Sequence, residues 1–148
     1  MEANSSVETI QLALSDEAVL RCKHILCDLY PHIPQEDEAF LFTIRKLQVE
    51  GYNLAYIEKN GTAASLVGFR VGENLAWGKY IFIDELATAP KYRHQGLASA
   101  IIDWLTDYAK TKKCSKIFLD FVMMDQKAKA WAEQKGFKPY STRYAITL

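Results

Sequence analysis

Arg93, Gly96 and Ala98 form the segment whose residue types and spacing most clearly suggest chemistry, R-x-x-G-x-A. The segment is expected at the start of a helix, where about four backbone N–H groups have no partner within the helix. These N–H groups and the helix dipole attract anions. Gly96 has no Cβ, so a phosphate can approach the main chain closely, and Arg93 adds positive charge. The segment therefore predicts a site for a phosphate or pyrophosphate.

Two other phosphate-binding motifs are excluded. The chain contains no Walker-type G-x-x-x-x-G-K-[ST] loop. It also lacks a G-x-G-x-x-G motif followed about 20 residues later by an acid, so a dinucleotide-binding fold is unsupported. Taken alone, R-x-x-G-x-A favours a turn glycine in front of a core helix over a phosphate site.

The elements that must position this segment follow from hydrophobic spacing, turn residues and breakers. Strands are expected over 7–14, 52–58, 63–71, 80–88 and 116–122, with one or two more in 137–148. Helices are expected from an N-cap at Asp16 to Pro31, over 35–50 and 95–112, and from a cap at Asp125 to Gly136. Asn60-Gly61 predicts a tight hairpin, and 80–122 predicts a right-handed parallel crossover. The fold class is therefore α+β, an α/β sandwich with a mixed, mostly antiparallel central sheet and about four helices.

Composition limits the class of protein. The 148 residues suit a single domain over 1–148, and 18 basic and 18 acidic side chains give zero formal net charge, which argues against nucleic acid. The first 74 residues hold 11 acids and 6 bases, and the remainder hold 7 acids and 12 bases, so the second half suits an anion. No membrane span and no secretory signal are expected. Three cysteines without C-x-x-C predict reduced thiols, a cytoplasmic location and no metal site.

The wider context of the motif resembles the acyl-CoA-binding segment of the GCN5-related N-acetyltransferase (GNAT) superfamily, Q/R-x-x-G-x-G/A. Arg93, Gly96 and Ala98 fill that pattern, and a Pro-x-Tyr-Arg entry at 90–93 and an amphipathic helix over 97–109 surround it. The order of elements matches over nearly the whole chain, whereas the motifs match over about 80–137. The resemblance implies a GNAT-like sheet with a splayed pair of parallel strands, here 80–88 and 116–122.

The resemblance also implies where acetyl-CoA, the cosubstrate, would bind. Strand residues Leu86, Ala87 and Thr88 would pair with pantetheine as if it were an added strand. The pyrophosphate would lie on the amides of His94, Gln95, Gly96, Leu97, Ala98 and Ser99, next to Arg93. Asp125, which stands where many members carry Asn, is counted among the cofactor-binding residues. The acyl group would pass from CoA to a primary amine by direct attack.

A carboxylate is expected to remove a proton from the amine, because few amine molecules are free bases at pH 7. Asp84, Glu85 and Asp120 lie in strands that are otherwise apolar, and Asp84 and Glu85 are expected on opposite faces. Glu85 is the first candidate for the catalytic base and Asp120 the second. The family has no universal base, and each carboxylate is equally compatible with a structural ion pair.

The general acid of many family members is missing, since Ala132 stands where their tyrosine would be. Tyr140 or Tyr144 could replace it, although both are also compatible with ordinary strand aromatics. Two functions remain open: an acetyl-CoA-dependent N-acetyltransferase, or a CoA-binding regulatory or interaction domain with little turnover. The expected acceptor is a small-molecule or peptide amine. Acids at 36–38 favour a cationic one, and the resemblance leaves open a homodimer through the C-terminal strands.

Overall fold

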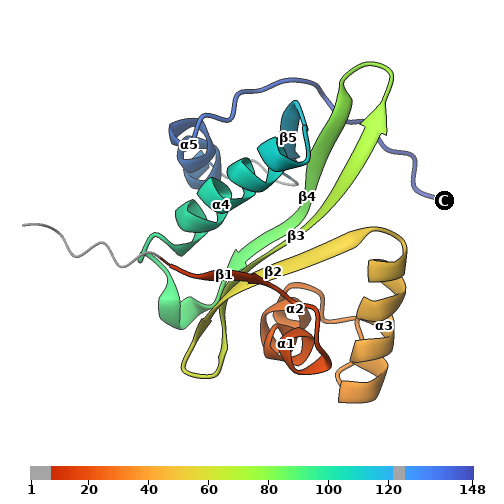
Figure 1. Cartoon of the computed structure of the whole chain (residues 1–148), viewed down its shortest axis with the longest axis vertical. Helices are drawn as coiled ribbons and strands as arrows, with labels where there is room; N and C mark the ends of the chain where they lie inside the picture. Colours follow the sequence, from red (N-terminus) through yellow and green to blue (C-terminus); the bar gives the residue numbers. More distant parts are fainter. Residues whose placement is uncertain (1–7, 122–125) are drawn as a thin grey trace, which may run out of the picture.

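The computed structural model describes residues 8–121 and 126–148. Two helical layers enclose one sheet, with α1, α2 and α3 on one side and α4 and α5 on the other (Figure 1). The elements in chain order are β1 (Ile10–Leu12), α1 (Asp16–Arg21), α2 (Lys23–Leu29), α3 (Asp37–Val49), β2 (Tyr52–Lys59), β3 (Thr62–Asn74), β4 (Gly78–Thr88), a 3-10 turn (Pro90–Tyr92), α4 (Leu97–Thr111), β5 (Lys116–Leu119) and α5 (Gln126–Gln134).

The sheet contains five strands in the order β1-β2-β3-β4-β5. All neighbouring strands are antiparallel except β4 and β5, which are parallel, so the predicted mixed sheet and parallel pair are confirmed. The hairpin between β2 and β3 turns at Asn60 and Gly61, whose φ angles are 54° and 79°. Positive φ at both central residues is what a two-residue hairpin turn requires.

The core lies on both faces of the sheet. Leu97, Ile101 and Leu105 recur on one face of α4 and are almost completely buried. On the sheet, Phe69 meets the rings of Trp104 and Tyr108 from α4 at centroid distances of 6.2 and 5.3 Å. This packing holds α4 against the sheet at β3.

The first helical segment differs from the expectation in its cap and its continuity. Ser15, rather than Asp16, is the N-cap, because its hydroxyl oxygen accepts a hydrogen bond from the Ala18 N–H at 3.1 Å. The segment is also divided into two helices, α1 and α2, which meet at Cys22. Both helices contribute buried residues to the core, Ala18 and Val19 from α1 and Ile25, Leu26 and Cys27 from α2.

The expected strands in 137–148 are absent, because no residue of this described segment pairs with the sheet. Tyr144, Ile146 and Leu148 alternate as strand residues would, yet all three side chains are fully exposed or nearly so. A strand needs a hydrogen-bonding neighbour as well as an alternating sequence. The segment instead runs past the long β3–β4 hairpin without joining it (Figure 1).

Candidate functional site

The end of β4 offers a free backbone edge. On one side, Leu86, Ala87 and Thr88 pair with β3. On the other side, β5 pairs only with Tyr80–Ile83, so among the described residues no strand covers β4 from position 84 onward. The buried Ser65 hydroxyl lies 2.8 Å from the Thr88 hydroxyl oxygen and 3.1 Å from the Ala87 carbonyl oxygen, which fixes this strand end. An extended ligand could therefore bind along residues 86–88 as an additional strand.

The free edge leads directly to the start of α4. Gly96 caps this helix with φ of 77°, and no side chain bonds to the first-turn N–H groups. The first turn carries no acid, and a Cβ at Gly96 would meet no atom within 4 Å. Arg93 folds back so that its Nε donates to the Thr88 carbonyl at 3.3 Å. The helix start thus presents unpaired N–H groups, an open approach and a nearby guanidinium, as an anion site requires.

The other residues of the predicted cofactor segment lie around this helix start. His94, Gln95 and Gly96 are exposed, Ala98 and Ser99 are half-buried, and the Leu97 side chain is buried in the core. Leu97 can therefore contribute only its backbone. Asp125, also predicted to contact the cofactor, lies outside the described residues.

Glu85 lies in a network with two tyrosines. The Tyr30 hydroxyl donates to Glu85 Oε1 at 2.8 Å, and the Tyr52 hydroxyl donates to Oε2. Burial raises the pKa of the Glu85 carboxyl, the two hydrogen bonds lower it, and Asp84 and Arg70 add smaller opposing effects. Burial and the bond to Glu85 raise the pKa of both tyrosines, so their hydroxyls remain donors. A carboxylate with a raised pKa is suited to general-base catalysis near neutral pH.

The expectation that Asp84 and Glu85 point to opposite faces is wrong. The register between β3 and β4 shifts after Gly68, which pairs with Glu85, while the next residue, Phe69, pairs with Ile83. Asp84 is therefore the extra residue of a β-bulge, which breaks the alternation of side chains. Its carboxylate binds Arg70 Nε at 2.9 Å, and Arg70 lies two residues from Gly68 on the same face. Both carboxylates thus reach the face covered by α1, α2 and α3.

Asp120, the second candidate base, has a different environment. It lies one residue after β5 and forms an ion pair with Arg143, with Nε and Oδ2 3.0 Å apart. Its side chain is 44% exposed, so Asp120 lies in a more open environment than Glu85. The structure brings Glu85 together with Tyr30 and Tyr52, and it brings Asp120 together with Arg143.

The candidates for a general acid are distributed away from Glu85. Ala132 is 2% exposed and, as an alanine, supplies no hydroxyl. Tyr140 packs against Trp77 and Phe118, with ring centroids 6.0 and 5.6 Å away, and Tyr144 is 91% exposed. Tyr30 and Tyr52 are the phenols that reach Glu85.

Sequence reasoning missed Tyr52 and its relation to Glu85. The available signal was Gly68 in the middle of an expected strand, because a strand glycine often marks a bulge or a close approach. Both features occur here. A Cβ at Gly68 would collide with the Glu85 carboxylate and the Tyr52 hydroxyl.

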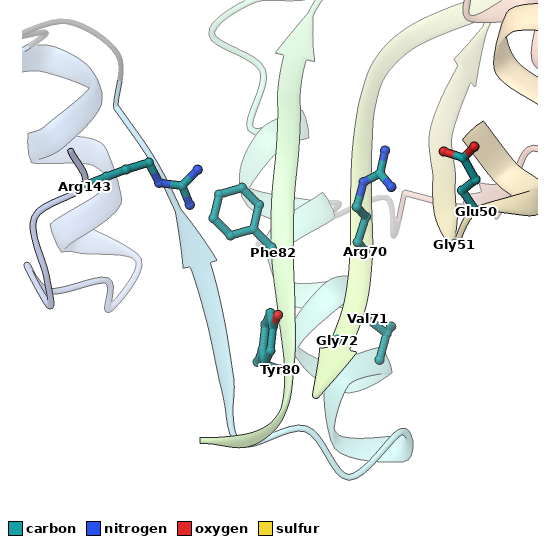
Figure 2. A pocket seen from close by; sticks show the side chains of 8 residues that line it. All are labelled: Glu50, Gly51, Arg70, Val71, Gly72, Tyr80, Phe82 and Arg143. Atoms are coloured by element: carbon teal, nitrogen blue, oxygen red, sulfur yellow. The ribbon is translucent and has the colours of Figure 1, made fainter. Parts of the chain in front are cut away.

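A cavity of about 400 Å³ lies next to this network, with Arg70, Tyr80, Phe82 and Arg143 in its wall (Figure 2). It opens on the face of the sheet that carries Glu85. Within the described part of the chain, no group of acidic, histidine and cysteine side chains could hold a metal ion. None of the helices described is both long and apolar enough to cross a membrane.

Comparisons with known proteins agree with this geometry. A family model described as the acetyltransferase (GNAT) family matches residues 19–137. An acetyltransferase from Trypanosoma brucei is similar in structure, with 18% identity, a TM-score of 0.79, and coverage of 95% of this chain and 99% of that one. A glucosamine-6-phosphate N-acetyltransferase from Arabidopsis thaliana gives 20% identity, a TM-score of 0.77 and the same coverage.

The solved structure of AAC(6')-Iy in complex with a bisubstrate analog, CoA-S-monomethyl-acetylneamine, is a third similar structure. It shares 14% identity and a TM-score of 0.80, with coverage of 97% of this chain and 99% of that chain. No curated protein matches the chain by sequence. At these identities the structural likeness concerns the fold.

Proposed function

Because the chain belongs to the acetyltransferase (GNAT) family, we propose that it transfers an acetyl group from acetyl-CoA to a primary amine. The observation that carries the proposal is the free edge of β4 over residues 86–88, which leads into the uncapped start of α4. An extended chain that ends in a pyrophosphate has the shape and charge to follow this path. The β4 edge would supply strand-like hydrogen bonds, and the helix start would supply N–H donors for the phosphates.

Glu85 has the environment of a general base for this reaction. Acetyl-CoA supplies the acetyl group as a thioester, and the amine nitrogen forms a bond to its carbonyl carbon as the C–S bond breaks. Glu85 accepts a proton from the ammonium group, through water, before the attack. Tyr30 and Tyr52 hold the carboxylate by one hydrogen bond to each oxygen. The nitrogen loses a second proton as the C–S bond breaks, and this proton passes to the leaving thiolate, whereas Glu85 releases the first proton to solvent.

Tyr30 could take the role of the missing general acid, because its hydroxyl reaches the Glu85 network and Ala132 has no hydroxyl. Its raised pKa keeps the hydroxyl protonated at neutral pH. A thiolate also leaves without protonation more readily than an alkoxide would. Turnover is therefore compatible with alanine at position 132.

Ala132 is also the observation that favours a second candidate function, a CoA-binding domain with little or no turnover. Release of free thiol from acetyl-CoA in the presence of a broad amine panel, measured beside CoA affinity by calorimetry, separates the two. Amine-dependent thiol release and a mass increase of the amine by one acetyl group support the transferase. Tight CoA binding without release of thiol for any amine supports the binding domain.

The acceptor, the cytoplasmic location and the homodimer stay predictions. The expected acceptor is a small-molecule or peptide amine, and no metal is assigned a role in the reaction. The structure of AAC(6')-Iy was solved with an aminoglycoside-derived bisubstrate analog, which makes small amines a sensible first panel.

A further inference from the structure

Two arginines face the same cavity beside the Glu85 network. The cavity holds about 400 Å³, which is within the usual range for small-molecule sites. Its wall contains Arg70 from β3, Arg143 from the C-terminal segment, Glu50 after α3, and the aromatic rings of Tyr80 and Phe82 (Figure 2). Each arginine pairs with one aspartate, and Glu50 is the one carboxylate among the residues that line the cavity itself.

Each guanidinium pairs with an aspartate through its Nε. Arg70 Nε is 2.9 Å from Asp84 Oδ2, and Arg143 Nε is 3.0 Å from Asp120 Oδ2. Arg70 also lies over the Tyr52 ring at 5.6 Å, and Arg143 lies over the Phe82 ring at 4.7 Å. The terminal Nη atoms of the two arginines take no part in these ion-pair contacts. These atoms form the fork that binds carboxylates and phosphates with two parallel hydrogen bonds.

The cavity and the proposed base lie on one face of the sheet. Arg70 and Gly68 are two residues apart on β3, and Gly68 pairs with Glu85. Tyr80 and Phe82 line the cavity from the stretch of β4 that pairs with β5, just before that pairing ends after Ile83. A small acceptor bound in the cavity would therefore lie beside the point where the parallel strands part, and the proposed acetyl transfer requires the thioester to reach this point.

We propose that the acceptor amine carries an anionic group, a carboxylate or a phosphate, and that Arg70 and Arg143 bind this group. The inference rests on the proposed acetyl transfer and names its substrate class. It replaces the cationic acceptor that the acids at 36–38 had favoured. Those acids lie at the start of α3, whereas the cavity is lined by Glu50 and Gly51 after its other end, and Asp37 is bound by Lys23 at 2.6 Å.

The test compares amines that differ only in the anionic group. β-Alanine is paired with β-alaninamide, and O-phosphoethanolamine with ethanolamine, each with acetyl-CoA and free thiol as the readout. We expect at least one anionic amine to have a kcat/KM at least tenfold above its neutral partner. The pair that shows the preference identifies carboxylate or phosphate as the recognised group. Equal or better use of both neutral partners would overturn the proposal.

Variants assign the preference to the arginines. In Arg70→Gln and Arg143→Gln, the ratio of anionic to neutral kcat/KM should fall towards one, mainly through a higher KM for the anionic amine. Arg143→Lys, which keeps the charge but loses the fork, should lie between wild type and Arg143→Gln. Arg45→Lys is the matched control, since Arg45 binds Asp16 at 2.7 Å outside this cavity. An unchanged ratio in both glutamine variants, with unchanged thermal stability, would contradict the assignment.

If the proposed acetyl transfer does not occur, the arginine site can still be tested by binding alone. If no amine in the panel releases thiol, the same pairs are titrated by calorimetry into the protein with CoA present. Tighter binding of an anionic amine than of its neutral partner would support the arginine site without turnover. Equal binding within both pairs would overturn it.

Discussion

Tyr52 donates a hydrogen bond to the Glu85 carboxylate across β3, although β2 and β4 are not neighbours in the sheet. The contact is possible because Gly68 of β3, which lies between them, has no side chain. A Cβ at Gly68 would occupy the space where the phenol and the carboxylate meet. The glycine is therefore as much a part of the site as the two groups that bind each other.

Gly68→Ala should lower both stability and turnover. The added methyl group must displace Glu85 and Tyr52, and overpacking of this kind typically costs about 1–3 kcal/mol. Denaturant unfolding measures the loss, and thiol release measures the activity. The double variant Gly68→Ala/Glu85→Ala should lose less stability than the sum of the single variants, because the carboxylate clash is gone. Wild-type stability and activity in Gly68→Ala would contradict the described packing.

The five strands of the sheet, the hairpin turn and the helix α4 could be predicted because each depends on local sequence. Asn60-Gly61 specifies its turn through backbone conformation, and the apolar spacing of α4 specifies its buried face. The bulge at Asp84 could not be predicted in the same way. One extra residue in β4 reverses the expected facing of the side chains beyond it, and the register is set by pairing with β3. The Tyr52–Glu85 contact follows from that register.

The C-terminal segment shows the same limit. Tyr144, Ile146 and Leu148 have the alternation of a strand, but alternation indicates only that a strand could form. Whether it forms depends on an available edge, which is a tertiary property. Arg143 shows what the segment does instead, since its guanidinium lies over Phe82 and pairs with Asp120.

Glu85→Gln should reduce kcat by about 10²–10⁴, the usual contribution of a general base. Burial raises the pKa of Glu85 above its ordinary value, so the wild-type rate should rise with pH as this carboxyl loses its proton. The variant should lack that rise. The pH dependence of kcat measures the difference. Asp120→Asn is the comparison, and a full rate in Glu85→Gln with a large loss in Asp120→Asn would transfer the role to Asp120.

Tyr52→Phe should move the acidic limb of the pH profile to higher pH. The Tyr52 hydrogen bond lowers the pKa of Glu85, so its loss leaves the buried carboxylate less stabilised. A hydrogen bond to a charged group corresponds to a shift of about 1–2 pH units. Tyr30→Phe should shift the limb in the same direction, and Tyr144→Phe, at an exposed position, should not shift it. If the acidic limb of the pH profile is unshifted in both Tyr52→Phe and Tyr30→Phe, the two tyrosines do not influence the pKa of the catalytic base.

Gly96→Asp should weaken CoA binding on the order of 100-fold or more, since a carboxylate would face the phosphates at short range. Gly96→Asn is the matched control. Both side chains are short and polar, and both tolerate the positive φ of 77° at this position better than other residues do. The Asn variant should therefore retain most of the affinity measured by calorimetry. Equal losses in the two variants, or none, would argue against an anion site at this helix start.

The three cysteines should differ sharply in reactivity. Burial raises the pKa of the Cys22 thiol to about 12, so at pH 8 only about one molecule in 10⁴ carries the reactive thiolate. Cys27 is also buried, with a raised pKa, whereas Cys114 is partly exposed. An aromatic disulfide reagent should modify one thiol rapidly in the native protein and all three after denaturation. Cys114→Ser should abolish the rapid phase. If Cys22 or Cys27 is still modified rapidly in that variant, the helices that bury these two thiols open readily.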